Sequence, residues 1–196
     1  VLEIEKQGGA ISSFMLKGSE INPLSWALTV DQMPANNRSG AVFKGHFLCV
    51  GRWGSPSSGE IKAGIPHNGE ASRDWWEVRP GSGKRQLQMQ IQAPLDGILV
   101  ERTVIMDEKY PVFQVHETFT NQNSFGRLSN VVQHVTLGPP FLSAETRVYS
   151  NAKQGFLQSF SWPDPYQHAF TWPIAHDPVH QKNIDLQRAD YPGNYV

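Results

Sequence analysis

The sequence has little of three features that mark large classes of protein: cysteine, net charge and long apolar runs. Its 196 residues hold one cysteine, Cys49, which excludes an internal disulfide and any metal site built from several thiolates. Lys and Arg total 17 against 18 Asp and Glu, so no charge excess favours nucleic acid or a membrane surface. No apolar stretch approaches the roughly 20 residues of a membrane-spanning helix. We therefore expect neither nucleic-acid nor membrane partners.

Familiar motifs are also missing. Nothing resembles a phosphate-binding loop, a nucleophile elbow or a paired-carboxylate signature, so no cofactor is expected. No signal peptide is recognisable, and the sequence is compatible with either the cytoplasm or the periplasm. Cys49 lies in the apolar run 47–50, which predicts a small buried side chain rather than a nucleophile.

The patterns that are present are mostly those of β-strands. Residues 86–92 (QLQMQIQ) alternate strictly between glutamine and apolar side chains, which indicates a strand with one solvated face. Similar runs, separated by turn-forming residues, occur at 98–106, 112–120 and 128–137, and shorter ones at 1–6, 10–17, 41–50 and 74–79. With 17 Gly, 14 Pro and no sustained helical period, the chain is predicted to be an all-β, antiparallel sandwich.

The composition of the sequence changes from about residue 155, where proline and aromatic residues become frequent. This predicts long irregular structure of the kind that forms functional loops. The last residues, YPGNYV, carry no terminating turn. We therefore expect residues 1–196 to be one domain that forms the N-terminal portion of a longer domain, completed by a further C-terminal segment or a second chain.

Two histidines are candidates for acid–base chemistry. His134 shares a strand face with Asn130 and Thr136, where an imidazole can titrate near neutrality; the alternative is a histidine on a solvated face. His67 lies in the turn Pro66-His67-Asn68-Gly69, which could direct it into a cleft or leave it exposed. The adjacent Trp75 and Trp76 face opposite ways on a strand, so one is core and the other lines a surface.

A metal site is not expected. His176 and His180 are four residues apart, but Pro178 lies between them and prevents a regular helix from presenting both. Neither they nor His168 belong to a recognisable ligand set.

Three segments, in this order, resemble the aldose 1-epimerase, or galactose mutarotase-like, superfamily: CVGRWGSPSSGEI (49–61), GIPHNGEASRDWWEV (64–78) and FTNQNSFGRLSNVVQHVTLG (119–138). In that family a Gly-Arg pair precedes a His-Gly turn that leads to a tryptophan, and a later strand carries a second histidine. Arg52, His67 and His134 match those positions. Two departures stand out: Asn68 interrupts the family's His-Gly-Gly turn, and the aromatic residue that follows the second histidine is displaced.

The resemblance implies an antiparallel β-supersandwich with a sugar in a cleft on its concave face. His134 would act as the general acid at the ring oxygen, and the second catalytic residue, His67, would hold hydroxyls and the developing charge together with Arg52. Arg52 and Asn68 would hold hydroxyls, and an exposed tryptophan such as Trp76 would stack on the sugar. The family's general base is a glutamate in its C-terminal third, to which no position of this sequence corresponds, so we expect these 196 residues alone to be inactive.

Two other functions are compatible with the same residues. One is a non-catalytic carbohydrate-binding β-sandwich, since aromatic loops and neutral amides suit sugar recognition without chemistry. The other is a structural domain of a larger assembly, with a sheet edge at Tyr195–Val196 as its interface.

Overall fold

The structure is a computed structural model that describes residues 1–157, 164 and 166–188. The chain divides into two compact units, Val1–Phe141 and Leu142–Val196, and each is described by itself. The expectation of one domain over 1–196 stays a prediction. The sheet edge expected at Tyr195–Val196 lies outside the described residues.

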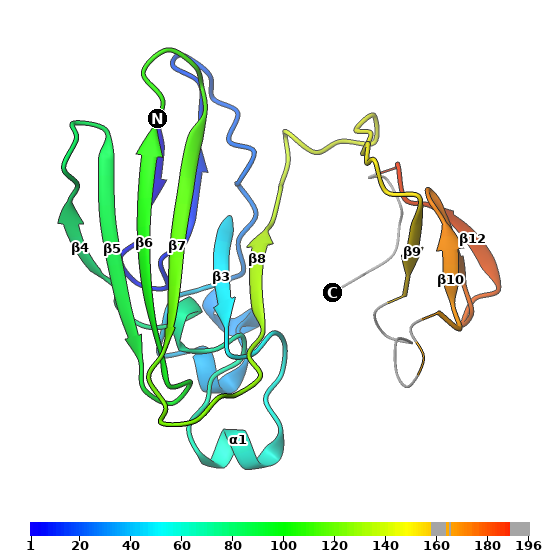
Figure 1. The fold of residues 1–196 in the computed structure, drawn as a ribbon. Coiled ribbons are helices and arrows are strands. Elements are labelled where there is room, and N and C mark those ends of the chain that lie inside the picture. Colours follow the sequence, from blue (N-terminus) through cyan, green and yellow to red (C-terminus); the bar gives the residue numbers. More distant parts are fainter. Residues whose placement is uncertain (158–163, 165, 189–196) are drawn as a thin grey trace. The chain divides into compact units, whose positions relative to one another are not determined.

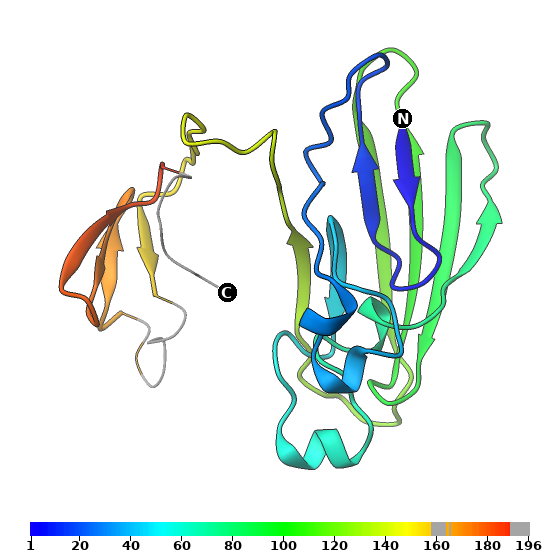
Figure 2. The same ribbon diagram turned by 180° about the vertical axis from the view of Figure 1, so that it is seen from behind.

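The first unit is built on two four-stranded antiparallel sheets (Figures 1 and 2). One has the strand order β1-β2-β3-β8, made of Leu2–Ile4, Ile11–Phe14, His46–Val50 and Val131–Val135. The other has the order β4-β5-β6-β7, made of Glu77–Pro80, Gln86–Ala93, Ile98–Met106 and Phe113–Asn121. The predicted all-β, antiparallel class is confirmed, and a strand is present in each predicted run, with ends that differ from the prediction by up to a few residues.

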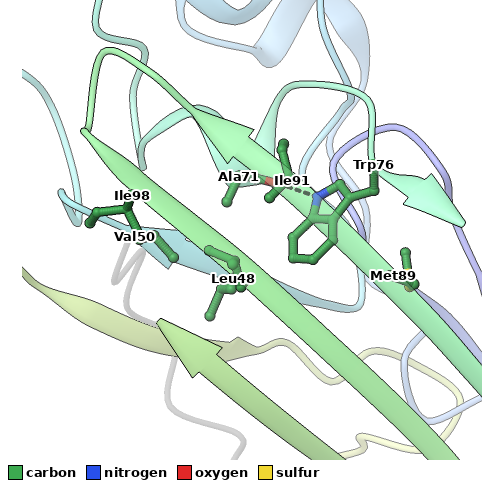
Figure 3. Packing of buried hydrophobic residues seen from close by; sticks show 8 residues of the cluster. Leu48, Val50, Ala71, Trp76, Met89, Ile91 and Ile98 are labelled. Carbon is green, nitrogen blue, oxygen red and sulfur yellow. Dashed lines mark hydrogen bonds between the residues drawn. The ribbon is translucent and has the colours of Figure 1, made fainter. Parts of the chain in front are cut away.

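The inner faces of both sheets meet in one apolar core (Figure 3). Its buried members are Leu48, Val50, Ala71, Trp76, Met89, Ile91, Ile98 and Val100. Strict alternation explains which residues of β5 enter the core: Met89 and Ile91 turn inward, while the glutamines that alternate with them turn outward. Burying each large aliphatic side chain stabilises the fold by about 1.5–3 kcal/mol.

Strand β3 has a second apolar face. Phe47 and Cys49 point away from the core just described and pack with Ala10, Met33 and Phe43. The segment between β2 and β3 supplies most of this cover, including two 3-10 turns, Val30–Gln32 and Ala35–Asn37. Cys49 is fully buried, as predicted, and burial raises the pKa of its thiol to about 12. Because both faces of β3 are covered, this strand positions side chains in two separate environments.

The second unit, within its described residues, is not the irregular structure that the sequence predicted. Gln154–Phe156 (β9) pairs with Ala169–Thr171 (β10), and Ile174–Asp177 (β11) pairs with Lys182–Asp185 (β12), both antiparallel. That prediction was wrong because strands of three or four residues are too short to display an alternating period.

Helix is confined to short pieces. The α-helix Ser58–Lys62 (α1) begins at a capping box in which Ser57 accepts the Glu60 N–H and Glu60 accepts the Ser57 N–H. Single 3-10 turns account for the rest of the helix in the described residues, including Glu70–Ser72. None of the helices in this part of the chain is long and apolar enough to cross a membrane.

Candidate functional site

His67 is held by its backbone in the connection between β3 and β4. Its N–H donates to Asn37 Oδ1 at 2.9 Å, and Asn37 Nδ2 donates to the His67 carbonyl at 3.1 Å. Its ring Nδ1 lies 3.3 Å from the Ser55 hydroxyl. Burial lowers the pKa of His67, and the charge of Arg52 lowers it further. The imidazole is therefore neutral at pH 7 and half-buried.

The residues after His67 fix the turn. Asn68 adopts a positive φ of 64°, which asparagine tolerates better than most residues, and its Oδ1 accepts the Gly54 N–H at 2.8 Å. Gly69 has a φ of 81°, and a Cβ there would lie 2.0 Å from the Val50 carbonyl oxygen. Asn68 is buried, and its hydrogen bond to Gly54 closes the loop between these two residues. The prediction that Asn68 binds substrate is not supported by this geometry.

Arg52 lies beside His67 and is already partly neutralised. Its guanidinium donates to the Ser55 carbonyl at 2.9 Å and to both carboxylate oxygens of Glu60. Arg52 also holds the pKa of Glu60 down at about 2. Its Nε is enclosed and has no hydrogen-bond partner among the described residues. Arg52 and His67 thus share Ser55 as a neighbour, and Arg52 keeps one donor unused.

His134 belongs to β8 and faces the second apolar cluster. Its ring stacks on Phe47, with centroids 4.4 Å apart and planes at 15°. Phe47 stacks in turn on Phe43 at 5.0 Å, and Phe43 lies 5.9 Å from the ring of His67. Burial lowers the pKa of His134, and its Nδ1 is enclosed without a partner in the described part of the chain. We call this series of four rings the aromatic column.

The aromatic column shows which predicted residues come together. His67 and His134 lie at its two ends, with two phenylalanine rings between them, rather than in contact. Both lie on the face of β3 that carries Phe47, and Arg52 adjoins His67 through Ser55. The alternative of a fully solvated His134 is therefore excluded.

Trp76 does not belong to this group, and the expectation that it is the exposed tryptophan is wrong. It is 3% exposed, and its Nε1 donates to the Ala71 carbonyl at 2.9 Å (Figure 3). It packs in the core on the opposite face of β3 from Phe47. Trp75 is the exposed member of the pair, at 66%. The sequence could not distinguish the two because adjacent strand residues differ only in face.

Two buried carboxylates lie near this loop and were not predicted. Glu70 accepts the N–H groups of Leu95 and Asp96, and Asp96 accepts the Glu70 N–H at 2.9 Å. Burial is the main cause that raises the pKa of both groups. Each carboxylate therefore fastens the backbone of the other's loop.

A second buried polar network lies between the sheets. Arg102 contacts the Trp76 ring at 4.6 Å and donates to Glu117 at 2.7 Å. Glu117 accepts from Gln133, whose side-chain oxygen lies 2.7 Å from His46 Nε2. One sequence signal could have revealed it: Arg102 occupies the apolar face of the run 98–106. This network lies on the opposite side of β8 from His134.

Metal ligands do not gather in the described residues, where no group of three or more His, Cys, Asp or Glu side chains could hold an ion. His180 pairs with Asp177 at 2.6 Å and His176 with Asn183 at 3.2 Å. Comparison with known proteins finds no matching family model, no matching curated protein and no matching solved structure.

Proposed function

We propose that this chain is a carbohydrate-active domain of the aldose 1-epimerase type, in which Arg52 and His67 form one end of a sugar-binding face and His134 forms the other end. The observation that supports the proposal best is the aromatic column, which links both histidines on one face of β3 beside Arg52. Arg52 Nε and His134 Nδ1 are also enclosed polar atoms without partners in the described residues, so the hydrogen-bonding capacity of this face is not used up within the protein.

The chemistry would be a pair of proton transfers. A base removes the proton of the anomeric hydroxyl, an acid protonates the ring oxygen, and the C1–O5 bond breaks to give an open-chain aldehyde. Rotation about C1–C2 followed by the reverse transfers closes the other anomer. Burial keeps His134 neutral at pH 7, so it can donate a hydrogen bond to the ring oxygen, but it must first take up a proton to act as the general acid.

A non-catalytic carbohydrate-binding module is the second candidate, and one observation favours it. The Arg52 guanidinium is engaged by Glu60, and no ion pair joins His67 or His134 to a carboxylate within the described residues. Without a carboxylate base the column would bind a sugar and leave its anomeric centre unchanged.

Two measurements test the proposal and separate the candidates. Binding is measured by NMR titration with methyl α-galactoside and methyl α-glucoside, which cannot open their rings. Polarimetry on fresh α-galactose and α-glucose, against a buffer blank, measures turnover. We expect binding that His67→Ala weakens, while His176→Ala in β11 does not. We also expect no acceleration by these 196 residues.

The outcomes distinguish every case. Acceleration that His134→Ala abolishes would establish the enzyme and refute the expectation that a base is lacking. Unchanged affinity in His134→Ala, without turnover in the native chain, would favour the binding module. Failure of both glycosides to bind would overturn the proposal.

A further inference from the structure

In Figure 1 the sheet β4–β7 lies in front of β1 and β2, so its outward face is toward the reader. The side chains of this face form a regular polar array. The strand register aligns two rows across four strands. The first row is Glu77, Gln90, Glu101 and Thr118, and the second is Arg79, Gln88, Thr103 and His116. Neighbouring strands lie about 4.8 Å apart, so each row is about 14 Å long. We call this array the polar rows.

The polar rows enclose a hollow. A cavity of about 180 Å³ is lined by Glu77, Arg79, Gln88, Met89, Gln90, Glu101, Arg102 and Thr103. This volume is below the roughly 300–1,000 Å³ of sites that enclose a drug-sized ligand. The hollow therefore suits one small ring held against the sheet rather than a ligand engulfed by the protein.

Of the seven polar side chains that line this hollow, four have hydrogen-bond partners and three have none within the described part of the chain. Glu77 accepts from Arg79 at 3.0 Å and from Gln90 at 2.8 Å. The side chains of Gln88, Glu101 and Thr103 form no hydrogen bond within the described part of the chain. They offer an amide, a carboxylate and a hydroxyl, which together can both donate and accept.

A large aromatic side chain stands on the same face. Glu77 and Arg79 of β4 point outward, while Trp76 enters the core and Val78 packs against it. Trp75 precedes β4 and pairs with Gln7 in an isolated antiparallel bridge, so its extended backbone places it two residues before Glu77 on the outward side. Trp75 is 66% exposed. An exposed indole presents a flat, rigid face that can stack on a ligand with an apolar surface. The C–H face of a pyranose is such a surface, and its hydroxyls point toward the rim.

We propose that the outward face of β4–β7 binds a neutral, extended oligosaccharide, with one sugar stacked on Trp75 and another over the hollow in the polar rows. Arg79 is neutralised by Glu77, and Glu101 adds one negative charge, so an anionic polysaccharide is repelled. This site is separate from the aromatic column, and its ligand is a chain rather than a single sugar.

The test is an NMR titration of the 196-residue chain with cellohexaose and maltohexaose, with heparin as the anionic arm. We expect chemical shift changes on β4, β5 and β6, and at least tenfold weaker binding in Trp75→Ala. Trp53→Ala is the matched control, since Trp53 is also exposed but lies in the loop after β3. Gln88→Ala is a second variant, on a solvated face where the fold is not at risk.

Every outcome of this test either supports or overturns the proposal. The proposal is overturned if neither neutral oligosaccharide binds, or if heparin binds more tightly than both. It is also overturned if Trp75→Ala and Gln88→Ala bind the oligosaccharide as tightly as the native chain does. His134→Ala separates it from the proposed function, because that variant should leave cellohexaose binding unchanged. Competition by excess methyl α-galactoside should likewise leave it unchanged. A loss of oligosaccharide binding in His134→Ala would assign the ligand to the aromatic column instead.

Discussion

Breaking the buried pair between Arg102 and Glu117 should be the most destabilising simple change on the inner face. The two side chains are 2% and 6% exposed, so neither charge is hydrated. Glu117→Leu removes the carboxylate and leaves the guanidinium with only the Gly9 carbonyl and the Trp76 ring as polar partners. An uncompensated buried charge costs about 3–5 kcal/mol of the free energy of unfolding.

The double variant should recover most of that loss. When Arg102→Met accompanies Glu117→Leu, no buried charge remains, and an apolar pair of similar volume often matches a buried ion pair in stability. We therefore expect the double variant to lie within about 1–2 kcal/mol of the native chain. For a chain of this length about 3–5 kcal/mol corresponds to a fall in Tm of roughly 6–20 °C for the single variant.

Urea unfolding, followed by tryptophan fluorescence and by circular dichroism, measures these differences, and coincident curves test for two-state behaviour. Arg79→Met is the control, because Arg79 and its partner Glu77 are exposed and such pairs contribute about 0–1 kcal/mol. The reasoning is refuted if Glu117→Leu lowers the free energy of unfolding no more than Arg79→Met does. It is also refuted if the double variant loses as much stability as Glu117→Leu and Arg102→Met lose separately.

Three further changes test other parts of the structure. Gly69→Ala should lower the free energy of unfolding by more than about 1 kcal/mol, because the positive φ and the Val50 carbonyl both oppose a Cβ. Gly59→Ala is the control, since its Cβ would meet no other atom, and thermal melts of both variants measure the difference. Burial raises the pKa of Glu70, so the folded state holds its proton more tightly and stability falls as pH rises from 4.5 through that pKa; Glu70→Gln should flatten this slope in urea titrations, and an unchanged slope would contradict it. The pKa of His134, followed by NMR, should lie below 6.5 in the folded chain and rise in urea; a folded value above 6.5 would exclude the burial argument.

The aromatic column illustrates what the sequence could and could not predict about the site. His67 and His134 were identified from a turn and from a strand, but their link passes through Phe43 and Phe47. Nothing local relates those two rings to either histidine. Stacking depends on how the segment before β3 folds back over it, which is a long-range packing result.

Buried polar groups were the least predictable. Glu70 and Asp96 are 26 residues apart and interact through each other's backbone N–H groups. A sequence shows two ordinary acidic residues there, since only the folded loops bring a donor to each carboxylate. The burial of Arg102 is one that the sequence could have predicted, because this charged residue occupies the apolar face of an alternating strand.

The sequence by itself determined the β class, the strands of the first unit and which side chains alternate, because strand geometry turns successive residues to opposite faces whatever the rest of the chain does. Only the tertiary structure decided which side chain is interior where no polar alternation marks the faces, as at the two adjacent tryptophans. It placed Trp76 in the core and Trp75 outside, and it put two rings between the histidines. The physical reason is that burial is a property of the surface that packs opposite, which a strand's own residues do not specify.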